Sequence, residues 1–481
     1  MSELNISQKI KSSTKWTSIS MLTQTLIQFF QTMLLTKFIE PKDFGSFSII
    51  MIIITILLIF LDLGILNRVI QNQENNKVIL SSIYWLLIIM GIVLYLLLFQ
   101  ASPLIADFYN TEDMDKYLRI TGLALLFISI GYLYQFLLQK EFLFKITAVS
   151  EIVGVLAGFS TALYLAITDR GIFALIGGYV VNNGVKYLIL FGIGLKYFKP
   201  VLAFDLRQLK GYFSFGKYQV GEKLLHYITY NLDYIIIGRL LGSEILGYYN
   251  LAYQLVIAPA MKINPIITQV SFSFFSKIKN NLAMLKKAYF KTIEFIAFIN
   301  IPLMSGIILL SPYFVPIVFG QNWNNSVPII QSLGVMGLFR ITNSLLPQLG
   351  LSIGNVRLTF IWTLINLMFL IPTLILGSMT GNIIIVCILL SLLQILFFIA
   401  GYFYYIKRII NATWIEYTEM LKKPVYNSLI MSIILFWLQN TLLNEVLLSN
   451  LLILTLIGII IYFLLSIKNN KNLIIQIVSR K

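Results

Sequence analysis

The chain has 481 residues, of which 58% are hydrophobic and 12% are charged. Soluble globular domains carry roughly 45–50% apolar and about 25% charged residues, so this composition excludes an ordinary water-soluble globule. The formal net charge of +16 would suggest nucleic acid as the partner of a soluble protein. Here the basic residues lie mainly in short loops between apolar runs, where they set membrane orientation, and no nucleic-acid partner is expected.

Apolar runs broken by charged or turn residues recur along the whole chain. A membrane-spanning helix needs roughly 20 apolar residues, and these runs reach that length. We therefore predict an all-α polytopic membrane protein with about fourteen transmembrane helices. The predicted spans, in chain order, are 13–36, 44–66, 79–100, 117–138, 147–167, 171–195, 212–237, 246–273, 290–319, 327–350, 357–377, 382–406, 425–443 and 447–467.

The basic residues of the predicted loops give these spans an orientation. With the N-terminus in the cytoplasm, the inner segments hold 26 Lys and Arg residues and the outer loops hold six. Cytoplasmic loops of membrane proteins carry such an excess of positive charge. We therefore expect a multi-pass protein of the bacterial cytoplasmic (inner) membrane with both termini in the cytoplasm.

The two halves of the chain show an internal repeat at an offset of 202 residues. Gly45 and Phe47 align with Gly247 and Tyr249, at equivalent helix ends. Six spans separate the two copies, so both copies cross the membrane in the same direction, as in transporters built from parallel repeats. The pattern predicts two pseudo-symmetric six-helix lobes and a C-terminal helix pair with a tail. The predicted divisions are 1–200, 201–410 and 411–481.

A polar stripe follows one face of the first span, where Gln24, Gln28 and Gln31 recur at three- and four-residue steps. We expect it to line a water-filled cavity between the lobes and to contact substrate, because lipid is unfavourable for polar side chains. Hydrogen bonding between helices of one bundle is the alternative interpretation. The repeat places four residues of the seventh span at equivalent positions, namely Glu222, His226, Tyr230 and Asp233.

Four basic residues lie within predicted spans: Lys186, Lys223, Lys262 and Arg340. An unpaired charge near the bilayer centre costs roughly 2.5–3.5 kcal/mol, so each needs a function or a partner. We interpret them as substrate-binding residues for an anionic group such as a lipid pyrophosphate. The alternatives are internal pairing, for example of Lys223 with Glu222 or with a carboxylate on another helix, and snorkelling of Lys186 and Lys262 towards the interface.

Charged residues near helix ends are candidates for gating or ion coupling. Asp62 and Arg68 flank Gly64 at the inner end of the second span and are interpreted either as a gate pair or as a solvated interfacial pair. Glu222 and Asp233 of the seventh span join this group.

His226 is the only histidine, and one imidazole does not make a metal site. It is interpreted as a cavity-lining, substrate-contacting residue. We predict no catalytic residue, no metal and no cofactor. A Walker-type loop is also missing from the sequence. Active transport would therefore use an ion gradient, the membrane potential or downstream consumption of substrate.

Three segments resemble the polysaccharide transporter family, the Wzx-type oligosaccharide flippases of the multidrug/oligosaccharidyl-lipid/polysaccharide exporter superfamily. They are NLDYIIIGRLLGSEILGYYNLAY at 231–253, FLDLGILNRVIQ at 60–71 and FGQNWNNSVPIIQSLG at 319–334. The resemblance covers roughly residues 10–410. It implies alternating access and translocation of an undecaprenyl-pyrophosphate-linked oligosaccharide, a precursor of polysaccharide, O-antigen or capsule. The implied partners are the lipid bilayer, this glycan lipid and polysaccharide assembly proteins.

Alternative functions remain open. Drug/cation exporters of the same superfamily typically couple ions through acidic residues of the N-lobe, but no Asp or Glu lies between Trp16 and Thr36. Lipid II flippases have fourteen spans and a cationic cavity, but the first span here has no Arg. A membrane-embedded glycan polymerase or ligase usually has a sizeable outer loop with Arg and His, and the outer loops near 101–116 and 320–326 are short and lack His. We therefore expect a transporter and not an enzyme.

Overall fold

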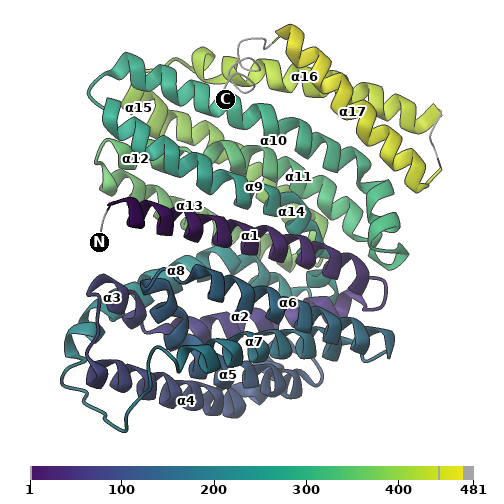
Figure 1. Cartoon of the computed structure of the whole chain (residues 1–481). Helices are drawn as coiled ribbons and strands as arrows, with labels where there is room; N and C mark the ends of the chain where they lie inside the picture. The colour runs from purple at the N-terminus through teal and green to yellow at the C-terminus, as the bar shows by residue number, and fades with distance from the viewer. Residues whose placement is uncertain (1–2, 442–444, 470–481) are drawn as a thin grey trace. The chain divides into compact units, whose positions relative to one another are not determined.

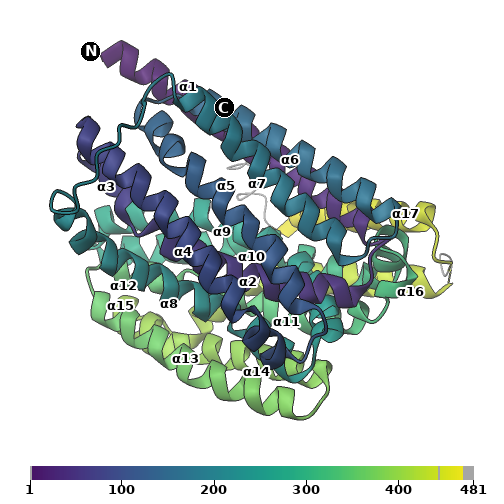
Figure 2. The same cartoon turned by 90° about the horizontal axis from the view of Figure 1, so that it is seen from below.

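The computed structural model describes residues 3–441 and 445–469, with the side chains of some helical residues left out. All regular secondary structure of this described part is helical, which confirms the predicted all-α class. The chain divides into two compact units, residues 1–247 and 248–481. Figures 1 and 2 show both units as bundles of long helices.

The first unit contains the purple to teal helices of Figure 1. They are α1 (Glu3–Leu35), α2 (Pro41–Asp62), α3 (Ile65–Gln71), α4 (Lys77–Tyr109), α5 (Met114–Lys140), α6 (Phe144–Ile167), α7 (Ile172–Gly194) and α8 (Lys210–Leu240).

The helix α9 (Ser243–Ile278) begins at the end of the first unit and continues into the second. The remaining helices of the second unit are α10 (Leu282–Val318), η1 (Gln321–Trp323), α11 (Ser326–Asn343), α12 (Leu346–Ser352), α13 (Val356–Met379), α14 (Ile383–Gly401), η2 (Tyr402–Ile406), α15 (Lys407–Ile410), α16 (Trp414–Thr441) and α17 (Leu448–Asn469).

Each predicted span overlaps a long helix, and residues 442–443 of the predicted span 425–443 lie outside the described residues. Within the described ranges, nine helical segments are long and apolar enough to cross a membrane, which confirms a multi-span membrane protein. The other long helices, α1, α8, α9, α11 and α16, are outside this set. The total of fourteen spans stays a prediction.

The structure interrupts two of the predicted spans. The second span breaks after Asp62, where Leu63 and Gly64 both adopt left-handed backbone angles with φ of 48° and 63°. Such angles end an α-helix, and glycine adopts them without steric cost. The span 327–350 breaks between α11 and α12, where Pro347 stands in the first turn of α12. Proline is suited to that position because its missing N–H would have no helical partner there.

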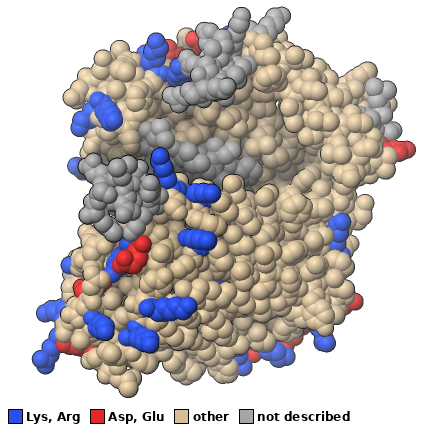
Figure 3. Space-filling view, viewed as in Figure 1, with Lys and Arg blue, Asp and Glu red and all other residues tan. Residues whose placement is uncertain are grey.

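The surface is apolar, as a lipid environment requires. Broad areas of the face in Figure 3 carry no charged side chain. On α13, for example, Phe360, Leu364 and Met368 are exposed at four-residue steps along one side of the helix. An exposed apolar stripe of this kind is costly in water but favourable in a bilayer.

Two packing relationships bear on the predicted domains. Helix α8, the first of the predicted second lobe, packs on α2 and α3 of the first unit. The helix pair α16 and α17 packs on α10, where Tyr462 Oη donates a hydrogen bond to the carbonyl oxygen of Phe298 at 2.8 Å. The division into repeated lobes at 200/201 and the separate tail from 411 stay predictions.

Candidate functional site

One polar network joins α1, α6 and α7 within the first unit. At its centre is the carboxylate of Glu151 on α6. Ser20 Oγ donates to Glu151 Oε2 at 2.8 Å, and Gln24 Nε2 donates to the same oxygen at 3.1 Å. Lys186 Nζ on α7 lies 3.3 Å from Glu151 Oε1. Three donors from two neighbouring helices therefore surround one carboxylate, and Figure 2 shows these three helices running together.

Glycines allow this network to form, because they let α6 and α7 approach closely. A methyl group at Gly154 would lie 2.8 Å from the carbonyl oxygen of Asn182 and 3.0 Å from Cβ of Lys186. One turn further along, a methyl group at Gly158 would lie 2.6 Å from the carbonyl oxygen of Gly178. Small residues at a membrane helix interface permit such backbone proximity. The approach brings Lys186 within reach of Glu151.

A second charged contact joins α2 and α8. Lys223 Nζ donates to Asp62 Oδ2. The Asp62 side chain is 6% exposed and that of Lys223 is 37% exposed, so the pair lies at the edge of the packed interior. Of the alternatives considered for Lys223, the structure shows pairing with a carboxylate on another helix. Glu222, the other candidate, is exposed.

The break after α2 positions this pair. A methyl group at Gly216 of α8 would lie 1.9 Å from the carbonyl oxygen of Leu63, so α8 passes directly over the helix break. A methyl group at Gly64 would in turn lie 2.9 Å from Cα of Gly216. These two glycines make the crossing of α2 and α8 dependent on the left-handed turn that follows Asp62.

Arg68, the expected partner of Asp62, lies elsewhere. Its guanidinium carbon is 5.7 Å from the ring centroid of Tyr212 at the start of α8, a distance at which cation–π attraction operates. Asp62 forms its ion pair with Lys223 instead. The charged residues of this region therefore connect α2 and α3 to α8 at two separate points.

Arg340 belongs to the second unit. It stands in the last turn of α11, immediately before the break that precedes α12. Its Nη1 donates to Tyr253 Oη of α9 at 3.0 Å, and its guanidinium carbon lies 5.7 Å from that ring centroid. A cation at this place is favoured by the negative end of the helix dipole. Lys262 also belongs to α9, but its side chain lies outside the described residues.

The polar stripe of α8 is exposed over most of its length. Glu222, His226 and Tyr230 follow at four-residue steps, and all three are exposed. The His226 and Tyr230 rings stack at 4.4 Å. Asp233, at the end of the stripe, is buried and accepts a hydrogen bond from the backbone N–H of Tyr234 at 3.0 Å. The exposed part of this face requires water or a polar ligand, since lipid offers neither.

The stripe of α1 divides into two parts. Gln24 turns inward to Ser20 and Glu151, which is the helix–helix hydrogen bonding considered as the alternative to a cavity. Gln28 is exposed and Gln31 is half-buried. The structure thus brings Gln24 and Lys186 together around Glu151, and it brings Asp62 and Lys223 together.

Residues with metal-binding side chains are scattered. In the part of the chain that the structure describes, no three His, Cys, Asp or Glu residues come close enough to hold a metal ion. The single Cys387 is buried in α14.

Sequence reasoning missed Glu151 and Tyr253. Glu151 had a usable signal, because an acidic residue within an apolar span is rare and is normally paired or functional. Tyr253 had no such signal, since 26 tyrosines are distributed through the chain.

The chain matches the family model described as polysaccharide biosynthesis protein over residues 34–328. It is 31% identical to the lipopolysaccharide biosynthesis protein WzxC of Escherichia coli, over 89% of this chain and 87% of that protein. It is also 31% identical to the teichuronic acid biosynthesis protein TuaB of Bacillus subtilis, over 90% of this chain and 89% of that protein.

Among solved structures, the chain is similar in fold to the lipid II flippase MurJ in an inward closed conformation. The TM-score is 0.75 at 18% identity, over 95% of this chain and 99% of that one. A multidrug resistance MATE family transporter of the MOP superfamily, in an inward-facing conformation, gives a TM-score of 0.57 at 16% identity. The match covers 83% of this chain and 99% of the transporter chain. These similarities establish a fold of the MurJ and MATE type.

Proposed function

The chain belongs to the polysaccharide biosynthesis protein family, and from this premise we propose that it flips a polyprenyl-pyrophosphate-linked oligosaccharide across the bacterial cytoplasmic membrane. WzxC and TuaB, the relatives that align with nearly the whole chain, both have names that place them in the assembly of surface polysaccharides. The cargo is a precursor of such a polysaccharide, and it moves by alternating access. The protein acts as a transporter, without catalytic chemistry or a cofactor.

The observation that carries the proposal is the exposed polar face of α8. Glu222, His226 and Tyr230 form a continuous stripe on a helix in a protein whose remaining surface is largely apolar. Hydroxyl and amide groups of a glycan form hydrogen bonds with such side chains, whereas acyl chains do not. Gln28 and Gln31 of α1 add further hydrogen-bonding groups for the sugar.

The pyrophosphate requires cations, and the four intramembrane basic residues have different roles in the proposal. Arg340 lies at a helix break, and its planar guanidinium offers two parallel hydrogen bonds to a phosphate group. Lys186 and Lys223 each hold a carboxylate, so a phosphate would compete with Glu151 or Asp62 for them. We assign the first contact to Arg340 because its guanidinium fork matches the geometry of a phosphate group, with Lys262 on α9 as a further candidate.

The pair of Asp62 and Lys223 serves as a gate in this proposal. It connects α8 to the end of α2 at a left-handed break, where a change in two backbone residues would reorient the contact. Arg68 on α3 and Glu222 and Asp233 on α8 are proposed as candidates for coupling the movement to an ion gradient. Both termini are placed in the cytoplasm, and polysaccharide assembly proteins are the proposed partners.

A second candidate cargo is lipid II. MurJ, a lipid II flippase, has a higher TM-score than the MATE transporter and covers more of this chain. Both cargoes share a polyprenyl pyrophosphate, so Arg340 would serve either one. The glycan portion separates them, and it is the portion that the stripe of α8 would contact.

The test is transport of defined cargo by the purified protein in liposomes. A fluorescent polyprenyl-pyrophosphate oligosaccharide is expected to reach the outer leaflet, and lipid II is expected to compete weakly. Arg340→Ala should abolish this movement and Arg340→Lys should restore it in part, because an ammonium group lacks the guanidinium fork. Equal transport by Arg340→Ala and the unchanged protein would remove Arg340 from the mechanism. Preferential transport of lipid II would overturn the cargo assignment.

A further inference from the structure

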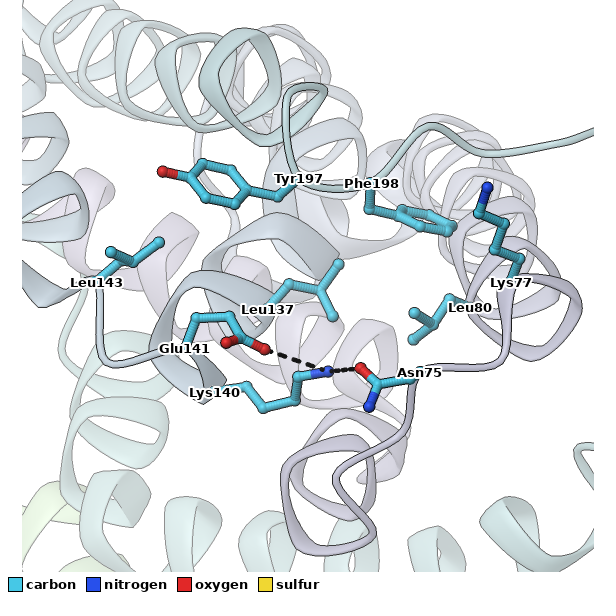
Figure 4. A pocket seen from close by; sticks show the side chains of 9 residues that line it. All are labelled: Asn75, Lys77, Leu80, Leu137, Lys140, Glu141, Leu143, Tyr197 and Phe198. Carbon is cyan, nitrogen blue, oxygen red and sulfur yellow. Dashed lines mark hydrogen bonds and ion pairs between the residues drawn. The ribbon is translucent and has the colours of Figure 1, made fainter. Parts of the chain in front are cut away.

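A cleft lies at the basic end of the first unit, apart from the polar faces of α1 and α8. It is bordered by the loop between α3 and α4, the turn between α5 and α6, and the segment after α7. Its volume is about 420 Å³, within the range of roughly 300–1,000 Å³ that small-molecule sites occupy. Figure 4 shows Lys140 and Asn75 on one side of the cleft, Tyr197 and Phe198 on the other, and Leu137 between them.

Lys140 lines the cleft, but protein atoms surround its ammonium group. It therefore has little capacity to bind a ligand. Its side chain is 4% exposed. Its Nζ donates to the carbonyl oxygen of Glu74 and to Asn75 Oδ1, both at 2.7 Å. Glu141 Oε1 also lies near, at 3.7 Å from Lys140 Nζ. The ammonium group is thus engaged in fixing the α3–α4 loop to the end of α5.

Lys77 provides the positive charge that a ligand would meet. It is the first residue of α4, and its side chain is exposed at the rim of the cleft. The N-terminus of a 33-residue helix carries a partial positive charge and backbone N–H groups without helical partners. An anionic group at this place would be attracted both by Lys77 and by the helix end.

Much of the remaining lining of the cleft is apolar. Leu80, Leu137 and Phe198 are buried, and Tyr197 presents an exposed aromatic ring beside them. Tyrosines of this kind are typical of the membrane–water interface, where one part of the ring contacts apolar groups and the hydroxyl contacts water. The cleft therefore combines a cationic rim with an apolar floor, which suits an amphiphile better than a free ion.

The surroundings indicate which amphiphile. Lys145, in the first turn of α6, lies two residues after Leu143, and Lys196 directly precedes Tyr197 in the segment after α7. Basic pockets between transmembrane helices on the positively charged side of a membrane protein bind anionic headgroups. We propose that this cleft binds an anionic glycerophospholipid of the adjoining leaflet. Lys77 and the start of α4 contact the phosphate, and the glycerol and first acyl carbons lie against Leu137 and Phe198.

The test measures lipid retention by the full-length protein, using native mass spectrometry after exchange into detergent with phosphatidylglycerol or phosphatidylcholine. Phosphatidylglycerol should be retained in preference. Lys77→Gln should weaken that retention about fivefold, the effect of one basic residue near an anionic headgroup. Lys199→Gln is the matched control, because it removes one charge from the same end without altering the cleft.

A second variant separates the cleft from general surface charge. Leu143→Trp fills the space with all charges retained, and it should weaken retention of phosphatidylglycerol as strongly as Lys77→Gln does. Equal losses in Lys77→Gln and Lys199→Gln would overturn the proposal, because they would indicate diffuse adsorption. Displacement of the lipid by excess inorganic phosphate would also overturn it in favour of a site for the ion alone. None of these outcomes depends on which cargo is flipped.

Discussion

Two charged contacts within the first unit differ in how completely each carboxylate is held. Glu151 accepts from Ser20 and Gln24 of α1 and from Lys186 of α7. Its side chain is 24% exposed and that of Lys186 is 18% exposed. This contact joins helices that glycines already bring close together.

Among the described residues, the Asp62 carboxylate in the contact of α2 and α8 has one donor. Asp62 is held by Lys223, whose side chain is 37% exposed, and the pair lies beside a left-handed helix break. A carboxylate with several donors stays in place when one is lost, whereas a carboxylate with one donor separates in a single step. From this difference we propose a structural role for the Glu151 site and a mobile role for the Asp62 site.

The largest effect is expected from Glu151→Ala. It leaves the ammonium group of Lys186 unpaired within the helix bundle, which should lower the free energy of unfolding by about 3 kcal/mol. Equilibrium unfolding in mixed micelles with increasing SDS would measure the loss. The control is Glu151→Gln combined with Lys186→Met, which removes both charges and should recover most of the stability. A Glu151→Ala protein as stable as the original would refute a structural role for this site.

A smaller effect is expected where α8 crosses the helix break. Gly216→Ala places a methyl group on the carbonyl oxygen of Leu63 and should cost about 2 kcal/mol through overpacking. Gly221→Ala is the matched control on the same helix, because nothing lies within 4 Å of a methyl group there. That control should leave stability unchanged or raise it by about 0.5 kcal/mol, since alanine favours helix. Equal free energies of unfolding for the two variants would show that α2 and α8 can move apart at the crossing without loss of stability.

Asp62→Asn should change stability by only about 1 kcal/mol or less, because Lys223 is partly solvated. Transport should fall much more than the amount of folded protein, if the pair is a gate. Glycan-lipid flipping and detergent-solubilised yield would be measured on the same preparations. The exchanged variant Asp62→Lys with Lys223→Asp should regain part of the activity. Full transport by Asp62→Asn would instead assign the pair a purely structural role.

The smallest effect concerns the loop before α4, where Tyr212 Oη donates to Glu74 Oε2 at 2.6 Å. Burial raises the pKa of Glu74, but the hydrogen bonds from Tyr212 and from the backbone of Asn76 and Asn75 outweigh it and lower the pKa below its usual range. A carboxylate with a lowered pKa adds stability above the pKa of the unfolded chain, and this stability is lost as the pH falls through the folded-state pKa.

Tyr212→Phe should therefore lower the free energy of unfolding slightly at neutral pH. The decrease of that free energy as the pH falls below the usual pKa of glutamate should be less steep in the variant. Thermal unfolding between neutral and acidic pH would measure this change. The same decline in both proteins would exclude Glu74 as a contributor. This contact joins α8 to the α3–α4 loop and shares no residue with the Glu151 network. Its loss should therefore leave that network unaffected.

The sequence by itself determined the helices and their membrane setting. An apolar run of about 20 residues has one stable arrangement in a bilayer, a helix that satisfies its own backbone hydrogen bonds. This is a local property, which is why each predicted span overlaps a long helix. The three quoted segments likewise identified the family, because they are contiguous in the chain. The breaks at Leu63 and before Pro347 were missed, since each interrupts a predicted span by only two residues.

Only the tertiary structure decided which charged groups meet. Lys223 was interpreted either as a substrate contact or as a member of an internal ion pair, and Asp62 as a partner of Arg68; the structure pairs Lys223 with Asp62, 161 positions away. Arg340 meets Tyr253 across 87 positions. Such pairs depend on how closely the helices approach, and that distance is set by glycines such as Gly154 and Gly216, whose effect appears only when a second helix lies against them. A charge within a span reveals in the sequence that a partner is needed, and the packing of the helices selects it.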